Sequence, residues 1–282
     1  MRTLKAAIQS WIYRLAVRVH PRFGIYIVNR TLPWGRPTLD YLEFHLADHC
    51  NLNCAGCFHY APFAERRLAD LEDVRRDFSR LSVLFKNIRH IRIMGGEPLL
   101  HPNVIEAAKI VRVAFPNSKI RIVTNGILLP KFEGLGALAK LNVGVDWTKY
   151  PPVAGLEMDI RRICCDAGVD LRITDNGAFI ARLNTDGSEG ILKAFIWCRE
   201  RMYCPLLDVG RVYPCAPARF AQTYNRVAGT NIHREEGLDI HISSAKDIML
   251  YLMRPSFSCR YCAASARTFT WKVCEGPEDW QI

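Results

Sequence analysis

Three cysteines on one short segment constrain this chain more than any other feature. Cys50, Cys54 and Cys57 stand in the sequence Cys-Asn-Leu-Asn-Cys-Ala-Gly-Cys. A loop of that length can fold three thiolates around one metal centre, and thiolates select zinc, Cu(I) or iron–sulfur clusters. A structural zinc ion requires a fourth ligand, for which His59 is the nearest candidate. A cubane cluster held by three cysteines instead leaves one iron open for chemistry.

The segments around this loop favour the cluster. Residues 41–47 read Tyr-Leu-Glu-Phe-His-Leu-Ala, which is typical of a strand, and residues 91–98 read Ile-Arg-Ile-Met-Gly-Gly-Glu-Pro. The combination resembles the radical S-adenosylmethionine (SAM) enzymes, which carry Cys-x3-Cys-x2-Cys after the first strand and Gly-Gly-Glu after the second. One position departs from that family. Gly56 stands where most members have an aromatic residue that contacts the adenine, and Phe58 follows the third cysteine.

The resemblance implies the cofactors and their chemistry. Cys50, Cys54 and Cys57 would hold a [4Fe–4S] cluster whose open iron binds SAM through its amino and carboxylate groups. An electron donor such as flavodoxin or ferredoxin would reduce the cluster. SAM would then be cleaved to methionine and a 5′-deoxyadenosyl radical, which abstracts hydrogen from an unactivated carbon.

The same resemblance assigns SAM-binding residues. Gly95, Gly96 and Glu97 are expected to meet the methionine amino group. Asn125 and Asp146 are further candidates to touch SAM or substrate, and the alternative is that they cap the helices that follow. Three histidines flank the motifs, and we expect structural hydrogen bonds from them rather than proton transfer. They are His49, His59 and His101.

The hydrophobic pattern predicts an α/β fold with alternating strands and helices. Strands are expected at 42–47, 90–94, 119–124, 142–147 and 169–174, and helices near 70–86, 103–114, 130–140 and 156–167. Repeated βα units imply a parallel sheet with right-handed crossovers. The motifs fall at the carboxyl ends of strands, where active sites of parallel barrels lie. The resemblance implies a partial (β/α)6 TIM-like barrel, which we place at residues 40–190.

Residues 191–282 have a different pattern, with Cys204, Cys215, Cys259 and Cys262 in it and Gly210 able to form a hairpin turn. These spacings resemble the shortened "twitch" version of the SPASM domain. The resemblance implies a small C-terminal domain with a second, auxiliary [4Fe–4S] cluster, held by these four cysteines. A structural zinc site is the alternative.

Four cysteines remain outside both predicted ligand sets. Radical SAM epimerases return a hydrogen atom to the substrate from a thiol, so each of the four is a candidate donor. Two of them fall in a predicted helix, where burial as small apolar side chains is the ordinary expectation. The four are Cys164, Cys165, Cys198 and Cys274.

Residues 1–39 are predicted to form an amphipathic helix and a linker. Apolar residues from Leu4 to Val19 recur at helical spacing among basic ones, and Pro21 ends the pattern. Such a helix either packs on the protein's own core or lies on an anionic membrane surface. No run of eighteen apolar residues is present, so no transmembrane helix is expected.

Composition limits the partners. The chain has 282 residues, eleven cysteines and a net charge of +10. The charge favours anionic partners, namely a phosphorylated or nucleotide-linked substrate, a membrane surface or nucleic acid, although solubility alone explains it equally well. Of these three, nucleic acid is the partner that we do not expect. The length and the lack of a signal peptide disfavour a secreted disulfide framework, so we expect a cytoplasmic protein, with peripheral membrane contact through the N-terminal helix as an option.

The predicted function is the oxidation or epimerisation of a carbohydrate-type small molecule, phosphate-bearing or lipid-linked, by radical SAM chemistry. One alternative is a radical SAM enzyme that modifies a peptide or protein. An alternative from another class is a non-catalytic iron–sulfur or zinc-binding redox module, which would not cleave SAM.

Overall fold

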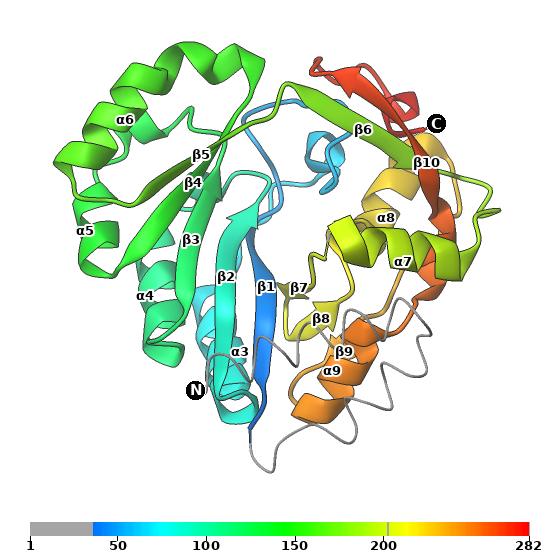
Figure 1. Ribbon diagram of the computed structural model, residues 1–282, viewed down its shortest axis with the longest axis horizontal. Coiled ribbons are helices and arrows are strands. Elements are labelled where there is room, and N and C mark those ends of the chain that lie inside the picture. Colours follow the sequence, from blue (N-terminus) through cyan, green and yellow to red (C-terminus); the bar gives the residue numbers. More distant parts are fainter. Residues whose placement is uncertain (1–35, 202, 282) are drawn as a thin grey trace.

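The computed structural model describes residues 36–201 and 203–281, so the predicted N-terminal helix lies outside the described residues. One large sheet organises the molecule (Figure 1). Its strands are β1 (Thr38–Ala47), β2 (Asn87–Gly95), β3 (Lys119–Thr124), β4 (Val143–Lys149), β5 (Leu171–Asp175), β7 (Leu206–Asp208), β8 (Arg211–Tyr213) and β9 (Leu238–Asp239). Their order in the sheet is β5-β4-β3-β2-β1-β7-β8-β9.

The first five strands pair in parallel in chain order, which confirms the predicted α/β fold with a partial TIM-like barrel. The connecting helices are α3 (Leu71–Leu84), α4 (Val104–Ala114), α5 (Leu135–Lys140) and α6 (Glu157–Asp166), and they lie along the outside of the strands (Figure 1). Helix α3 shows why. Val74, Phe78 and Leu81 recur on one face and are buried against the sheet, whereas Glu72, Arg75 and Arg76 are exposed.

One predicted helix is shorter than expected. The segment expected at 130–140 forms a 3-10 turn at Leu129–Lys131 and only then helix α5. Pro130 fits the first turn of a helix but cannot donate a backbone hydrogen bond, and Gly134 has low helix propensity. These two residues divide the segment.

The sixth parallel strand comes from an unexpected place. Strand β7 pairs in parallel with the free edge of β1, through Glu43 with Leu206 and Phe44 with Leu207. Strand β6 (Ala178–Leu183) leaves the sheet after β5 and pairs with the antiparallel strand β10 (Cys262–Thr270). The C-terminal region is therefore joined to the barrel sheet next to its first strand.

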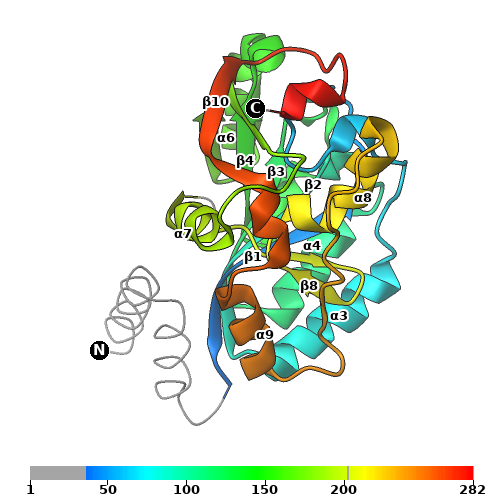
Figure 2. The ribbon, with the colours of Figure 1, turned by 90° about the vertical axis from the view of Figure 1, so that its right-hand side faces the viewer.

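The remaining helices belong to this C-terminal region. They are α7 (Ile191–Arg201), α8 (Ala216–Ala228) and α9 (Ala245–Met253). The predicted hairpin is present, because β7 and β8 are antiparallel around a turn in which Val209 and Gly210 have φ values of 42° and 71°. Strands β6 and β10 cross the end of the barrel toward which the carboxyl ends of its strands point (Figures 1 and 2).

A second apolar cluster packs the C-terminal residues against the segment that follows the cysteine loop. Tyr60, which follows the cysteine loop, packs there with Phe220 and Tyr224 of α8 and with Trp280 near the C-terminus. Trp280 is 3% exposed, and its ring centroid lies 6.0 Å from that of Tyr60. Burial of these aromatic rings holds the C-terminal residues against the start of the barrel.

No helix among residues 36–201 and 203–281 combines the length and apolar character needed to span a bilayer.

Asp77 of α3 fastens the β7–β8 hairpin to the barrel. It is 3% exposed, and its carboxylate accepts hydrogen bonds from the Gly210 backbone N–H (2.7 Å) and lies 2.9 Å from His241 Nε2. We expect Asp77→Ala to lower the free energy of unfolding by about 1–3 kcal/mol, because the buried N–H of Gly210 loses its partner. Denaturant unfolding measures this change.

Asp73→Ala on the same helix is the matched control. Asp73 forms an exposed ion pair with Arg76, so its loss should cost no more than about 1 kcal/mol. Equal losses in the two variants would contradict the role given to Asp77.

Candidate active site

The carboxyl ends of β1, β2 and β3 bring the predicted site residues together. The cysteine loop follows β1, Gly96 and Glu97 follow β2, and Asn125 follows β3. The side-chain amide of Asn125 donates to Asn51 Oδ1 (2.7 Å) and to Cys50 Sγ (3.4 Å). Asn125 therefore contacts the cysteine loop directly, from the third strand.

Gly95 and Gly96 allow the second strand to touch the backbone of the cysteine loop. A Cβ on Gly95, which has a φ of +147°, would lie 2.0 Å from the Ala47 carbonyl oxygen. A Cβ on Gly96 would lie 2.2 Å from the carbonyl oxygen of His49, the residue before Cys50. No side chain fits into those spaces, so the two glycines fix the distance between the Gly-Gly-Glu turn and the loop.

Glu97 ties the ends of β2 and β3 together. It is fully buried and accepts hydrogen bonds from Leu99 N (3.0 Å), Thr124 Oγ1 (2.8 Å) and Asn125 N (2.8 Å). Burial raises the pKa of Glu97 to about 7, and these three donors oppose the rise. Glu97 thus positions Asn125, and its contact with SAM stays a prediction.

Asp146 lies inside the barrel wall instead of capping a helix. One carboxylate oxygen accepts from Arg121 Nε, and the other accepts from Arg92 at 2.9 Å. The helix-cap alternative is wrong, because β4 continues to Lys149 and the Asp146 side chain turns toward the neighbouring strands. A contact of Asp146 with SAM or substrate stays a prediction.

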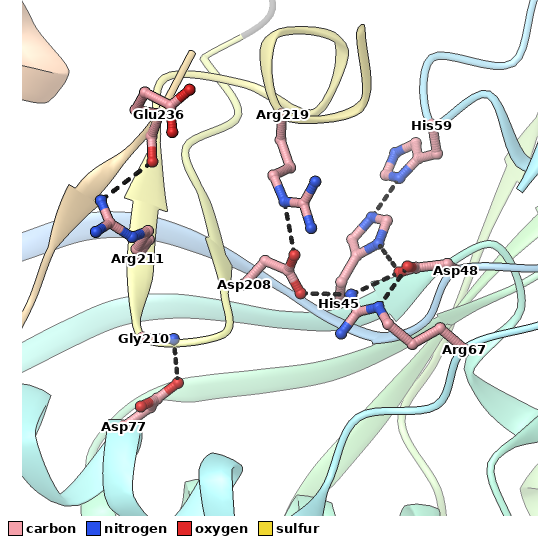
Figure 3. A network of polar contacts seen from close by, with 10 residues as sticks. All are labelled: His45, Asp48, His59, Arg67, Asp77, Asp208, Gly210, Arg211, Arg219 and Glu236. Carbon is pink, nitrogen blue, oxygen red and sulfur yellow. Dashed lines mark hydrogen bonds and ion pairs between the residues drawn. The ribbon is translucent and has the colours of Figure 1, made fainter. Parts of the chain in front are cut away.

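A network of polar contacts leads from the cysteine loop to the C-terminal region (Figure 3). His59 Nδ1 lies 2.6 Å from His45 Nε2, and His45 Nδ1 lies 3.4 Å from Asp48. Arg67 donates to Asp48 at 2.6 Å and to Asp208 of β7 at 2.6 Å. Arg219 of α8 also donates to Asp208, at 2.7 Å. This network was not predicted, because Asp208 and Arg219 are far along the chain from the other four members.

The other two flanking histidines differ from each other. His101 fits the structural role, since its Nε2 lies 3.0 Å from the Ala69 carbonyl and its Nδ1 accepts from Asn103 N. The buried Nδ1 of His49 has no hydrogen-bond partner among the described residues. An unsatisfied polar atom beside Cys50 suits a site that receives a polar ligand.

The cysteine loop fits a metal cluster in its chemistry. Burial, with a smaller contribution from the nearby Cys57 thiol, raises the pKa of Cys50 and of Cys54 to about 12. Such thiols stay protonated until a bound cation draws the protons off. Among the described residues, no group of three or more His, Cys, Asp or Glu side chains lies close enough together to bind a single metal ion.

The C-terminal segment covers this loop from the other side. Ala55 N donates to the Lys272 carbonyl (3.0 Å), Cys274 N donates to the Asn53 carbonyl (2.9 Å), and Trp280 Nε1 donates to the Cys57 carbonyl (2.7 Å). The ring of Phe269 fills the space beside Gly56, where a Cβ would lie 2.7 Å from it. An aromatic ring from β10 thus occupies the space above the position where the family's own aromatic is missing.

A cavity in the C-terminal region collects more cysteines than were predicted for it. All four predicted ligands line it, and a fifth thiol joins them from α7. The five are Cys198, Cys204, Cys215, Cys259 and Cys262. Burial raises the pKa of Cys215, and the thiols of Cys262, Cys198 and Cys259 raise it further. The chemistry of this donor set fits a second iron–sulfur cluster.

The remaining cysteines lie elsewhere. Cys164 is buried in the main apolar core, as expected, whereas Cys165 is exposed, because adjacent helix positions point about 100° apart. Cys274 is half-buried beside the first cysteine loop, where its backbone N–H bonds Asn53.

The close approach of Gly96 to the His49 carbonyl leaves no room for a side chain at position 96. In Gly96→Ala the new Cβ must displace the loop backbone, so we expect less iron bound after anaerobic reconstitution and a lower Tm. Gly136→Ala is the control, because no atom lies within 4 Å of its Cβ position in α5. That helical substitution should leave iron binding unchanged and raise stability by up to about 1 kcal/mol. Normal iron binding by Gly96→Ala would contradict the packing argument.

Part of the chain is similar in sequence to known proteins. GTP 3′,8-cyclases of Heliobacterium modesticaldum and Trichodesmium erythraeum are 32% and 34% identical to the chain, over 38% and 39% of its length. These matches span 34% and 35% of the relatives, so the chain covers about a third of their length.

Two solved structures are similar in part. BtrN in complex with AdoMet and 2-DOIA aligns with a TM-score of 0.48 and 16% identity, over 81% of this chain and 94% of that chain. Streptococcus suis SuiB bound to S-adenosylmethionine aligns with a TM-score of 0.42 and 18% identity, over 52% of this chain and 35% of that chain.

The family match coincides with the barrel. Residues 45–170 match the sequence profile of the Radical SAM superfamily, and this range contains the cysteine loop, the Gly-Gly-Glu turn and Asn125. Domains of this superfamily use a [4Fe–4S] cluster and SAM. The chain therefore carries a Radical SAM superfamily domain across residues 45–170.

Proposed function

We propose that this protein is a radical SAM enzyme that oxidises a carbohydrate-type small molecule, using two iron–sulfur clusters. The observation that carries the proposal is the presence of two thiol-rich sites. One is the three-cysteine loop at the carboxyl ends of the barrel strands, and the other is the five-cysteine cavity of the C-terminal region. When bound, the first cluster and SAM supply a 5′-deoxyadenosyl radical that abstracts a hydrogen atom.

The chain's own residues hold the first site in place. Asn125 bonds the loop at Cys50, and Glu97 fixes Asn125 through its backbone N–H. Gly95 and Gly96 set the distance between the turn and the loop. These contacts orient the cysteine thiolates and the SAM-facing backbone before the reaction, which is the protein's part in cofactor chemistry.

Oxidation explains the need for a second site. Converting an alcohol to a carbonyl removes two electrons and two protons. The radical takes one electron and one proton together as a hydrogen atom from carbon, and the hydroxyl proton leaves to a base. The last electron requires an acceptor, and a cluster held by the cysteines of the cavity would provide that redox capacity.

An anionic substituent on the substrate is supported by two observations. The chain has a net charge of +10, which attracts anions. The names of the curated relatives, GTP 3′,8-cyclases, include a nucleoside triphosphate. A phosphate-bearing sugar fits both observations. Reduction by a flavodoxin- or ferredoxin-type donor, and membrane contact through residues 1–39, are parts of the same proposal.

Five thiols surround a site that needs four. Helix α7, which carries Cys198, packs against the 3-10 helix Phe257–Tyr261 and against β10, which carry Cys259 and Cys262. Cys204 stands just before β7, which pairs with β1 of the barrel sheet. We therefore assign the auxiliary cluster to Cys198, Cys215, Cys259 and Cys262. This assignment places Cys198 where the spacing of the sequence suggested Cys204.

Iron content tests both the two-cluster proposal and the ligand set. After anaerobic reconstitution we expect about eight irons in the wild type and about four in Cys50→Ala/Cys54→Ala/Cys57→Ala. Cys198→Ser should lose most of the auxiliary iron, because the ligand set of the auxiliary cluster is then incomplete. Cys204→Ser should keep the auxiliary iron. The opposite pattern would restore Cys204 as a ligand. About four irons in the wild type, with zinc recovered, would make the cavity a structural site.

Epimerisation is the second candidate, favoured by the position of one spare thiol. Cys274 lies beside the first cysteine loop, unlike Cys164 in the core and Cys165 on the surface. If the enzyme oxidises, product formed in D2O should carry no deuterium on carbon, and Cys274→Ala should still turn over. Two results together would indicate epimerisation instead of oxidation. The product would carry deuterium at one carbon, and Cys274→Ala would lose turnover while still cleaving SAM. Mass spectrometry of the product distinguishes the two reactions.

A further inference from the structure

Trp271 makes a contact that neither the motif nor the barrel explains. Its indole Nε1 donates a hydrogen bond to the sulfur of Cys54, at 3.1 Å. Trp271 stands just after β10, more than two hundred residues from Cys54 in the chain. The C-terminal segment thus reaches a sulfur atom of the first cysteine set.

The backbone on both sides of Trp271 is held. Before it, β10 pairs with β6 through Phe269 with Phe179 and Thr270 with Ala178, and Trp271 N donates to the Gly177 carbonyl at 2.8 Å. After it, the Lys272 carbonyl accepts from Ala55 N, and Val273 forms a β-bridge with Cys54. The indole N–H is therefore aimed at the sulfur by fixed backbone, which lowers the entropic cost of the hydrogen bond.

A hydrogen bond to a cluster sulfur affects the reduced and oxidised states unequally. Reduction adds negative charge to the cluster and its thiolates, so a donor at the sulfur stabilises the reduced state more. The Cys50 sulfur accepts hydrogen bonds from Leu52 N and Asn125 Nδ2, both at 3.4 Å, and backbone N–H groups of residues 59–61 face the Cys57 sulfur. The hydrogen bond from Trp271 to Cys54 is shorter than the two to Cys50.

We infer that Trp271 raises the reduction potential of the cluster held by Cys50, Cys54 and Cys57, through its hydrogen bond to the Cys54 sulfur. The inference rests on the cluster assignment of the proposed function. It makes Trp271 a positioning residue that acts through a ligand, and it gives the C-terminal segment a part in how readily SAM is cleaved.

The chain offers a matched control. Trp280 is the second tryptophan of the same segment, and its Nε1 donates to the backbone carbonyl of Cys57 at 2.7 Å instead of to a sulfur. Trp271→Phe and Trp280→Phe each remove one indole N–H that anchors the segment on the loop. Only Trp271→Phe removes a donor to a sulfur.

Redox titration followed by electron paramagnetic resonance tests the inference on the reconstituted full chain. The cluster of interest is recognised because its signal changes when SAM is added. In Trp271→Phe we expect its midpoint potential to fall, so that at a fixed potential less of it is reduced. A tenfold loss of the reduced-to-oxidised ratio corresponds to about 59 mV for a one-electron couple. Trp280→Phe should keep the wild-type potential.

Unchanged potential in Trp271→Phe, or equal shifts in both variants, would overturn the inference. If Trp271→Phe does not fold, the Trp280→Phe variant with 15N-labelled tryptophan provides a second measurement. A hyperfine coupling between the SAM-sensitive cluster and a labelled nitrogen is expected there, and its absence would also overturn the inference. A wild type that binds no SAM-sensitive cluster would instead refute the proposed function.

Discussion

The carbonyl oxygen of His49 occupies the space that a side chain on residue 96 would need, and the rest of the site depends on this close approach. It brings the end of the second strand against the loop that follows the first. Glu97 then reaches the end of the third strand, and Asn125 returns from there to Cys50. Three strand ends are joined into one rigid cradle, in which each contact determines where the next one lies.

The C-terminal region completes this cradle. It adds β7 to the free edge of β1, and the Arg67–Asp208 ion pair fastens that strand to the cysteine loop through Asp48. The segment after β10 then covers the loop with backbone hydrogen bonds and two tryptophans. The thiol-rich cavity and the first cysteine loop are therefore parts of one connected structure, which suits a reaction that moves an electron from substrate to a second cluster.

The local parts of this structure could be predicted from the sequence. The strand expected at 119–124 coincides with β3, because its apolar residues are bounded by a charged start and by Asn125-Gly126. The cysteine loop and the Gly-Gly-Glu turn carry their own signals, since their spacing is short and their residue types are specific. The hairpin at Gly210 is equally local.

Contacts between distant segments could not be predicted. Nothing in residues 206–208 shows that they pair with β1, and nothing near Trp271 points to Cys54. Cys198 was not predicted as a cavity residue. It lies on helix α7, outside the Cys204/Cys215 and Cys259/Cys262 pairs whose spacing carried the prediction. Asp146 was predicted to lie near a strand end, but β4 continues to Lys149, and two arginines on neighbouring strands hold the Asp146 carboxylate.

SAM cleavage by the reconstituted protein distinguishes a radical SAM enzyme from a non-catalytic redox module. The full chain would be incubated anaerobically with SAM and dithionite, and 5′-deoxyadenosine and methionine would be quantified by mass spectrometry. We predict that both accumulate together with the wild type and that neither forms with Cys50→Ala/Cys54→Ala/Cys57→Ala. A wild type that carries its full iron but releases no 5′-deoxyadenosine would exclude radical SAM catalysis and indicate a non-catalytic redox module.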